Sequence, residues 1–352
     1  MDKLRIPPFS AHAAQAAQAR MDALAKLPGS LGKLEALAVR LAGISATPAP
    51  DFRVRQAVLF AGDHAIARRG VTGSSQGVTA VQVRNFLAGG GAINAFCRTA
   101  GCALTVVDVG MLEDVDAPNL VRRKVVRGVR DFSTGPAMTR EEARACLQVG
   151  VDMAREAAAR GVNLLAAGEM GIGNTTAATA ITAVLTGADV DMLAGLGDSS
   201  APATTQRVRQ TKARMVRQGI ARNTPNPADA LDVLASVGGA EIAAMAGLML
   251  GGASLRIPVI VDGFIAGAAA AVAAGLAPAV AGMLVGSHLS REPGHRILMQ
   301  YLNIPVYLEL DMRLGEGTGA VLLMPLIDMA TRILREMPTL EDLHIREHTP
   351  SC

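Results

Sequence analysis

The sequence has no tryptophan, and aromatic residues make up only 3% of its 352 positions. Because proteins that bind single-stranded nucleic acid stack bases on aromatic side chains, this scarcity argues against such a platform. The formal net charge is also small, at +3. In the densest basic run, residues 122–130, arginine and lysine are interspersed with valine, which indicates a solvated strand edge. We therefore expect no nucleic-acid partner.

Cysteine is scarce as well, with only four residues: Cys97, Cys102, Cys146 and Cys352. They form no CxxC pair and have no histidine at zinc-site spacing, so neither a disulfide framework nor a structural metal is indicated. The first residues lack the apolar core of a signal peptide. These observations predict a protein of a reducing compartment, the cytoplasm.

Charge is absent from residues 264–286, a stretch long enough to span a bilayer. The stretch consists mostly of alanine and glycine, and Gly275 and Pro278 interrupt it. Membrane insertion of such a segment would gain little, whereas small residues suit close packing of a helix on a sheet. We expect no membrane span.

Half of the residues are hydrophobic, which allows a large core. Short apolar runs recur, each followed by a glycine-bearing turn and usually by a helical stretch: residues 57–60, 104–109, 162–166, 258–261, 283–285 and 306–310. This alternation predicts an α/β fold, a three-layer open parallel sheet flanked by helices. We expect a large domain over 46–335. A small helical lobe is expected to combine residues 1–45, broken at 28–32, with the charged, helical residues 336–352.

Polar residues gather where the predicted strands end: at 62–64, 108–110, 168–176, 262–264, 286–295 and 315–319. In open α/β sheets, ligands bind at the carboxyl ends of the strands. We therefore expect these turns to meet at one crevice.

The last of these turns places Glu316 among Gly315, Gly317 and Gly319, between an apolar strand and an apolar helix. Glycine allows a sharp turn and the close approach of a ligand, and apolar flanks favour a raised carboxyl pKa. The pattern predicts a catalytic carboxylate. A glutamate that caps the following helix is an equally good interpretation of this segment alone.

A second turn, residues 171–176, precedes an alanine-rich helix and offers backbone N–H groups and hydroxyls to a phosphate. Its candidate ligands are Gly171, Gly173, Asn174 and Thr175. The turn is neither a Walker A loop nor a GxGxxG motif, and N-capping by Asn174 or Thr175 explains it equally simply. Lys212 is a candidate counter-charge, although its spacing alone favours a solvated helix face.

The histidines do not form a recognisable catalytic or metal motif. No GxSxG elbow accompanies Asp63 and His64, and the spacing of His288, Glu292 and His295 matches no HExxH site, so structural histidines are favoured. The polar loop 70–76 precedes a helix that carries Gln82 and Phe86 at i, i+4 spacing. The loop and helix suit a flat heteroaromatic ligand, or an ordinary loop and core helix.

These segments, in this order, resemble the nicotinate-nucleotide:dimethylbenzimidazole phosphoribosyltransferases of cobalamin lower-ligand assembly. The resemblance covers nearly the whole chain. It rests on ten blocks: residues 27–35, 62–64, 70–72, 78–82, 135–139, 168–176, 238–243, 261–264, 287–295 and 313–319.

The resemblance implies transfer of phosphoribose from nicotinate mononucleotide to 5,6-dimethylbenzimidazole, without metal or redox cofactor, by a homodimer with a parallel-sheet fold. It implies Glu316 as the catalytic base. Matching positions line the family's benzimidazole site and its nucleotide and phosphate region. The first set is Ser74, Gln82 and Leu314, and the second is Glu169, Gly171 and Lys212.

One segment departs from the family pattern. The family usually has Gly-Arg-Gly-Thr-Gly where this chain has residues 195–200, without the arginine, and Lys212 aligns only if a few extra residues precede it. Alternatives are transfer to another base or a phenol, and a non-catalytic paralogue that binds a nucleotide or heteroaromatic. A dinucleotide-dependent oxidoreductase is disfavoured, because no GxGxxG follows the first strand.

Overall fold

The computed structural model describes residues 4–195 and 202–345. Its centre is a parallel sheet of six strands in the order β3-β2-β1-β4-β5-β6. The strands are β1 (Arg55–Gly62), β2 (Ala103–Gly110), β3 (Leu120–Arg122), β4 (Leu164–Met170), β5 (Val259–Val261) and β6 (Leu284–Gly286). The predicted fold class is confirmed. The chain reverses its winding direction between β1 and β4, and such a switch point is where open α/β sheets bind ligands.

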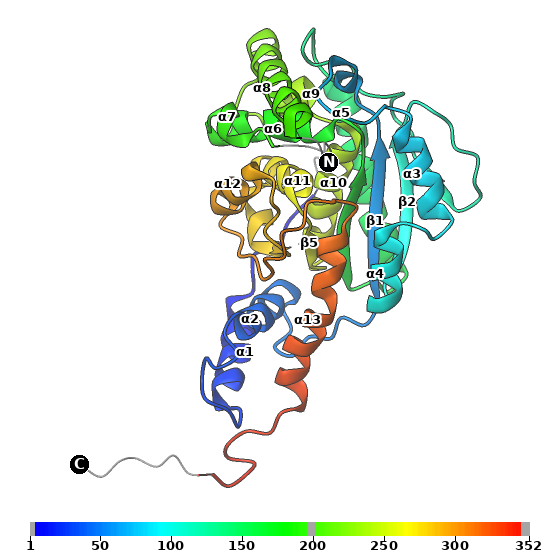
Figure 1. The fold of residues 1–352 in the computed structure, drawn as a ribbon. Helices are drawn as coiled ribbons and strands as arrows, with labels where there is room; N and C mark the ends of the chain where they lie inside the picture. Colours follow the sequence, from blue (N-terminus) through cyan, green and yellow to red (C-terminus); the bar gives the residue numbers. More distant parts are fainter. Residues whose placement is uncertain (1–3, 196–201, 346–352) are drawn as a thin grey trace.

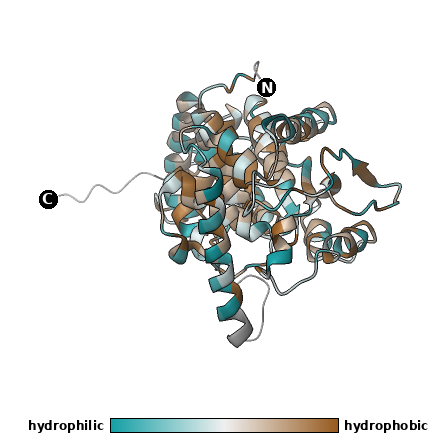
Figure 2. Cartoon of the chain, turned by 90° about the horizontal axis from the view of Figure 1, so that it is seen from above, coloured by the Kyte–Doolittle hydropathy of each residue, from teal (hydrophilic) through white to brown (hydrophobic). Residues whose placement is uncertain are grey.

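Helices cover both faces of this sheet (Figure 1). One face carries α3 (Val78–Leu87), α4 (Ala92–Ala100) and α13 (Thr318–Glu336), and the other carries α10 (Ala240–Ser254) with α5 (Arg140–Ala159) behind it. All eight residues of β1 are buried, and its apolar run after Arg55 and Gln56 suits a strand that is covered by helices on both faces. Seen from above, hydrophobic residues gather toward the middle of the molecule (Figure 2).

The remaining helices lie around this core and at the two ends of the chain. They are α1 (Ala11–Ala23), α2 (Lys33–Ser45), η1 (Ala65–Arg69), α6 (Asn174–Thr186), α7 (Val190–Leu193), α8 (Pro202–Asn223), α9 (Ala230–Val237), α11 (Phe264–Leu276), η2 (Pro278–Met283) and α12 (Pro293–Leu302). The uncharged stretch 264–286 forms α11, η2 and β6. In the described ranges, no helix is both long and apolar enough to cross a membrane.

Two predicted elements are wrong. Residues 306–310 do not form a strand: the segment makes a single bridge, from Leu308 to His288, and a left-handed Asp311 then turns it away. The expected helix after residue 336 is also absent from residues 337–345. Helix α13 ends at Glu336 because Pro338 disfavours helical geometry at the residue before it.

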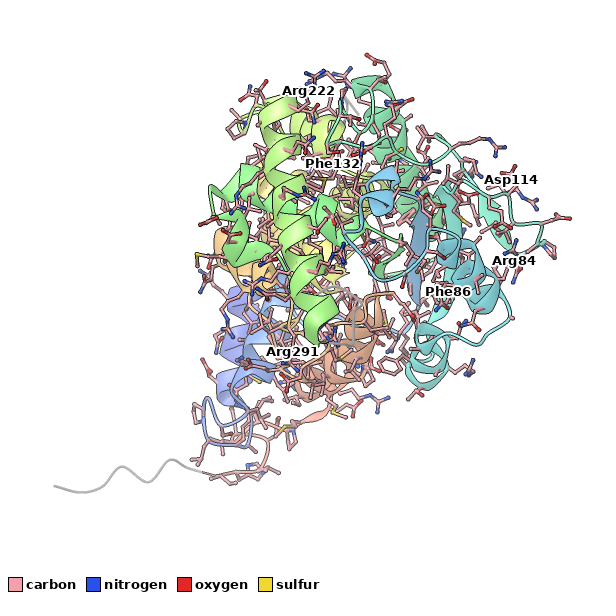
Figure 3. All side chains as sticks on the ribbon, turned by 45° about the horizontal axis from the view of Figure 1, so that its top comes forward. Arg84, Phe86, Asp114, Phe132, Arg222 and Arg291 are labelled. Carbon is pink, nitrogen blue, oxygen red and sulfur yellow. The ribbon has the colours of Figure 1, made fainter. Side chains whose placement is uncertain are left out.

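The basic run lies at the edge of the sheet, as expected, although the strand there is only three residues long. Arg122 pairs with Asp116, while Lys124 and Arg127 both pair with Asp114. Figure 3 shows Asp114 at the outer edge of the molecule. These cations are therefore already neutralised by neighbouring carboxylates.

The two chain ends contact one another. Helices α1 and α2 lie beside the lower half of α13 (Figure 1), and the Arg20 guanidinium donates to the carbonyls of Leu334 and Met337. An antiparallel bridge joins Leu24 to Thr339. These contacts agree with a lobe built from both ends, while the division at residues 45 and 335 stays a prediction.

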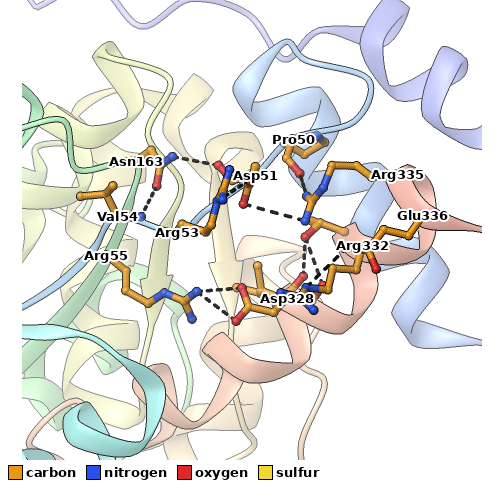
Figure 4. A network of polar contacts seen from close by, with 12 residues as sticks. Pro50, Asp51, Arg53, Val54, Arg55, Asn163, Asp328, Arg332, Arg335 and Glu336 are labelled. Atoms are coloured by element: carbon orange, nitrogen blue, oxygen red, sulfur yellow. Dashed lines mark hydrogen bonds and ion pairs between the residues drawn. The ribbon is translucent and has the colours of Figure 1, made fainter.

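A polar network ties the lower half of α13 to the start of β1 (Figure 4). Arg55 makes two hydrogen bonds, of 2.8 and 2.9 Å, to the two carboxylate oxygens of Asp328. Arg335 donates to the carbonyl of Pro50 and pairs with Asp51. Because bidentate arginine–carboxylate pairs are geometrically specific, this network fixes the helix whose other end carries the Glu316 turn.

Candidate active site

A cavity of about 560 Å³ lies at the carboxyl ends of the strands, around the switch point between β1 and β4. Segments that follow β1, β4, β5 and β6 line it, together with the segment before α13, so most of the predicted turns do meet. Its lining residues lie in five groups: Thr72, Ser74, Val78 and Gln82; residues 169–175; residues 262–266; His288, Ser290 and Glu292; and residues 313–316.

The turn after β2 is an exception to the predicted crevice. Asp108 accepts a hydrogen bond from the Met111 N–H and pairs with Lys124, in a separate small pocket. His64 also does not line the cavity: it is fully buried behind Gly173, and its Nε2 lies 2.6 Å from Glu241 Oε1. The structural interpretation of His64 agrees with this geometry.

Glu316 lies in a strained turn. Gly315, Glu316 and Gly317 all have positive φ, of 86°, 64° and 91°, a backbone conformation that costs energy for a residue with a side chain. The carboxylate does not cap α13, whose N-cap is Gly317. Its Oε2 instead accepts a 3.1 Å hydrogen bond from the Ile93 N–H at the start of α4. The alternative interpretation, in which Glu316 caps the helix that follows it, is therefore wrong.

Burial raises the pKa of Glu316 above that of an ordinary glutamate, and the neighbouring Asp262 raises it further. The turn rests directly on β4, since a Cβ at Gly168 would lie only 2.4 Å from the Glu316 carbonyl oxygen. A half-buried carboxylate with a raised pKa, at a cavity wall and on a fixed backbone, suits proton transfer.

Asp262, just after β5, holds this turn in place. Its two carboxylate oxygens accept hydrogen bonds from the N–H groups of Gly317 (3.2 Å) and Ala320 (3.0 Å). Asp262 therefore satisfies the first backbone donors of α13, a role usually taken by an N-cap side chain from the helix itself.

Glu169, at the end of β4, connects the turn that carries Glu316 with the turn of residues 171–176. Its Oε1 accepts a hydrogen bond from the Glu316 N–H (3.3 Å), and its Oε2 accepts one from the Asn174 side chain. The Asn174 side chain is thus committed to Glu169, and the N-cap of α6 is Gly173. N-capping by Asn174 or Thr175 is wrong, and the N-terminus of α6 faces the cavity without a side-chain cap.

Burial raises the pKa of Glu169 to about 8, so this carboxyl group is protonated in the folded protein at neutral pH. Between the ordinary glutamate pKa and pH 8 the folded state binds a proton that the unfolded state lacks, so stability falls as pH rises. We expect Glu169→Gln to flatten this decline by up to about 1.4 kcal/mol per pH unit. Denaturant unfolding at several pH values measures it, and parallel profiles for variant and wild type would contradict it.

Lys212 is fully buried in α8, so the expectation of a solvated helix face is wrong. Its Nζ donates a 3.0 Å hydrogen bond to the Thr175 hydroxyl. Lys212 is not among the described lining residues, but it lies directly behind one of them, Thr175, at the start of α6.

The segment 195–200 is the one that departs from the family pattern. Gly195 is described, and residues 196–200 lie outside the described ranges.

The residues predicted for a heteroaromatic base all line the cavity: Ser74, Gln82 and Leu314. Leu314 is 59% exposed, so an apolar surface is available there. Phe86, at i, i+4 spacing from Gln82 in α3, is buried in the core and does not line the cavity. Sequence reasoning placed no ligand role on several further lining residues, among them Asp262, His288, Ser290, Glu292 and Arg313. Their position just after strands, or in the turn before α13, was the available signal.

The chain is similar to known proteins over nearly its full length. A family model described as "Phosphoribosyltransferase" matches residues 6–345. Nicotinate-nucleotide–dimethylbenzimidazole phosphoribosyltransferases from Chloroflexus aggregans and Geobacter sulfurreducens are each 45% identical. The alignments cover 97% of this chain, and 96% and 97% of the two relatives.

A crystal structure of the Thermus thermophilus enzyme of the same name superposes with a TM-score of 0.90 at 42% identity. The superposition covers 96% of this chain and 100% of the Thermus thermophilus chain. The family match and the relatives at this identity and coverage agree with one another and with the fold. The chain therefore belongs to the nicotinate-nucleotide–dimethylbenzimidazole phosphoribosyltransferase family.

Proposed function

We propose that this protein transfers phosphoribose from nicotinate mononucleotide to 5,6-dimethylbenzimidazole and releases nicotinate and α-ribazole 5′-phosphate. A benzimidazole nitrogen forms the new bond to C1′, while the bond from C1′ to the pyridinium nitrogen breaks. The electron pair of that bond remains on nicotinate. The single observation that carries the proposal is Glu316, a carboxylate with a raised pKa at the wall of a cavity that Ser74 and Gln82 also line.

Glu316 is the proposed catalytic base. The leaving group is already a pyridinium and needs no acid, whereas the attacking imidazole ring becomes cationic unless its other N–H proton is removed. A carboxylate that accepts this proton raises the electron density of the nucleophile during attack. Its raised pKa makes it a better proton acceptor than an ordinary glutamate.

The N-terminus of α6 is the proposed phosphate site. It lacks a side-chain cap, and residues 171–175 line the cavity. Backbone N–H groups and the helix dipole favour an anion there. The buried Lys212 ammonium, bonded to Thr175, adds positive charge behind the turn. Fixing the phosphate in this way holds C1′ in line with the attacking nitrogen.

Replacing Lys212 by Met is expected to weaken nicotinate mononucleotide binding about tenfold or more, because the turn loses its nearest described charge-assisted hydrogen bond. Dimethylbenzimidazole binding should change little. Titration calorimetry with each substrate separates the two effects. Arg214→Met, an exposed cation on the same helix, is the control. Equal nucleotide affinity in the Lys212 and Arg214 variants would remove Lys212 from the phosphate site.

The decisive test offers the protein nicotinate mononucleotide with a panel of bases and phenols and identifies the products by mass. Dimethylbenzimidazole riboside phosphate, with equimolar nicotinate, supports the proposed transfer. A different conjugate would redirect the acceptor assignment. Binding without any product would favour a non-catalytic paralogue. The homodimer and the cytoplasmic location stay predictions.

A further inference from the structure

Glu292 differs from the other carboxyl groups of the cavity. Those of Glu169, Asp262 and Glu316 all accept hydrogen bonds within the protein. The Glu292 Oε2 atom is buried and has no hydrogen-bond partner in the described ranges, and the whole residue is only 8% exposed. A buried carboxylate oxygen without a partner is costly, so its presence in a cavity wall calls for a donor that the described residues do not supply, such as a bound ligand.

The turn that carries Glu292 is rigid. The Ser290 N–H donates to His295 Nδ1 (2.9 Å), the Glu292 N–H donates to the Ser290 hydroxyl (3.2 Å), and the His295 N–H donates to the Glu292 carbonyl (3.0 Å). Burial lowers the pKa of His295 to about 3, so its ring stays neutral and Nδ1 remains an acceptor. The Glu292 backbone is therefore fixed beside the cavity.

Glu292 lies near the proposed phosphate turn. It immediately precedes α12, which packs against α6 and α7. The backbone of Gly195 lies directly against it, since a Cβ there would be 1.6 Å from Glu292 Oε2. A larger residue at 195 would displace the carboxylate, so the acidic group is built into this wall.

The chemistry of the cavity narrows what Glu292 can bind. A carboxylate repels the phosphate and the nicotinate carboxylate, and the described ranges contain no cluster of three metal-ligating side chains. The benzimidazole N–H is assigned to Glu316. The remaining donors of the nucleotide are the two ribose hydroxyls, and carboxylates are suitable acceptors for a ribose diol.

We propose that Glu292 binds the vicinal hydroxyls of the ribose and selects ribonucleotides over deoxyribonucleotides. This inference rests on the proposed function, because it assumes nicotinate mononucleotide in this cavity. The ribose is then held between its phosphate, at the start of α6, and its hydroxyls, at the start of α12. Both contacts orient C1′ toward the base site.

The test measures binding of nicotinate mononucleotide and of its 2′-deoxy and 3′-deoxy analogues, without acceptor base, to the full-length protein. Wild type is expected to prefer the ribonucleotide by about 10- to 100-fold, the usual range for a hydrogen bond to a charged group. Glu292→Ala should lose most of this preference through weaker ribonucleotide binding. Glu292→Gln should retain part of it. Glu309→Gln, an exposed glutamate, is the control and should match wild type.

Thermal unfolding distinguishes substrate binding from a structural role. Glu292→Gln is expected to melt at or above the wild-type temperature, because it replaces a buried carboxyl group whose Oε2 atom has no hydrogen-bond partner in the described ranges. A full ribonucleotide preference in Glu292→Ala, or a lower melting temperature with all three ligands weakened alike, would overturn the inference. If wild type transfers phosphoribose and Glu292→Ala keeps the full preference for the ribonucleotide, only this inference fails. Selective ribonucleotide binding without transfer would instead count against the proposed function alone.

Discussion

Glu316→Gln is expected to slow phosphoribosyl transfer by a factor of about 100 to 10,000, the range that general-base catalysis contributes. The amide has nearly the shape of the carboxylate and retains an oxygen that can accept the Ile93 N–H, so the turn should keep its geometry. It cannot accept the benzimidazole proton. Binding of dimethylbenzimidazole, measured by calorimetry, should therefore change much less than kcat.

The pH profile gives this prediction a second readout. The base works only when deprotonated, so wild-type kcat should fall as pH decreases through the raised pKa of Glu316. The midpoint should lie above the ordinary glutamate value, and the variant should lose this acidic limb. Glu336→Gln, an exposed position at the far end of α13, the helix that follows the Glu316 turn, is the control. A Glu316 variant with wild-type kcat, or with the same acidic limb, would exclude Glu316 as the base.

The strands were largely predictable from the sequence, and so was the meeting of the turns at the carboxyl ends of these strands. Continuous apolar runs identify buried parallel strands such as β1 and β4, and strand direction alone places Glu169, Asp262 and Glu292 at one edge. The exception, residues 306–310, has a strand-like composition. The single bridge made by this segment is a tertiary outcome that composition does not encode.

Side-chain partners were not predictable in the same way. Asn174 has the composition and position of an N-cap, yet it binds Glu169, a carboxyl group that approaches from the preceding strand. Lys212 has the spacing of a solvated residue, yet α8 packs it against Thr175. In each case the deciding contact joins elements distant in the sequence or depends on backbone geometry. Patterns of helical or strand period carry no information on such contacts.

Asp262 provides the second large expected effect, because it controls Glu316 through the backbone. Asp262→Ala would leave the N–H groups of Gly317 and Ala320 buried without acceptors. Each such group costs about 1–3 kcal/mol, so we expect the free energy of unfolding to fall by about 2–6 kcal/mol. Denaturant unfolding measures this loss. Asp116→Ala, at an exposed carboxylate, should stay within about 0.5 kcal/mol of wild type.

The same substitution should impair catalysis in a manner typical of a positioning residue. Gly315, Glu316 and Gly317 hold left-handed backbone geometry that the surrounding hydrogen bonds must stabilise. Without Asp262 the turn can relax, and the Glu316 carboxylate leaves the place where it meets the base. We expect kcat to fall at least about tenfold with a smaller change in KM for nicotinate mononucleotide, because small misplacements of a reacting group are costly. Asp262→Asn, which keeps one acceptor oxygen, should recover part of both losses. If Asp262→Ala is as stable and as active as Asp116→Ala, the strained turn is held by its glycines and by β4 alone.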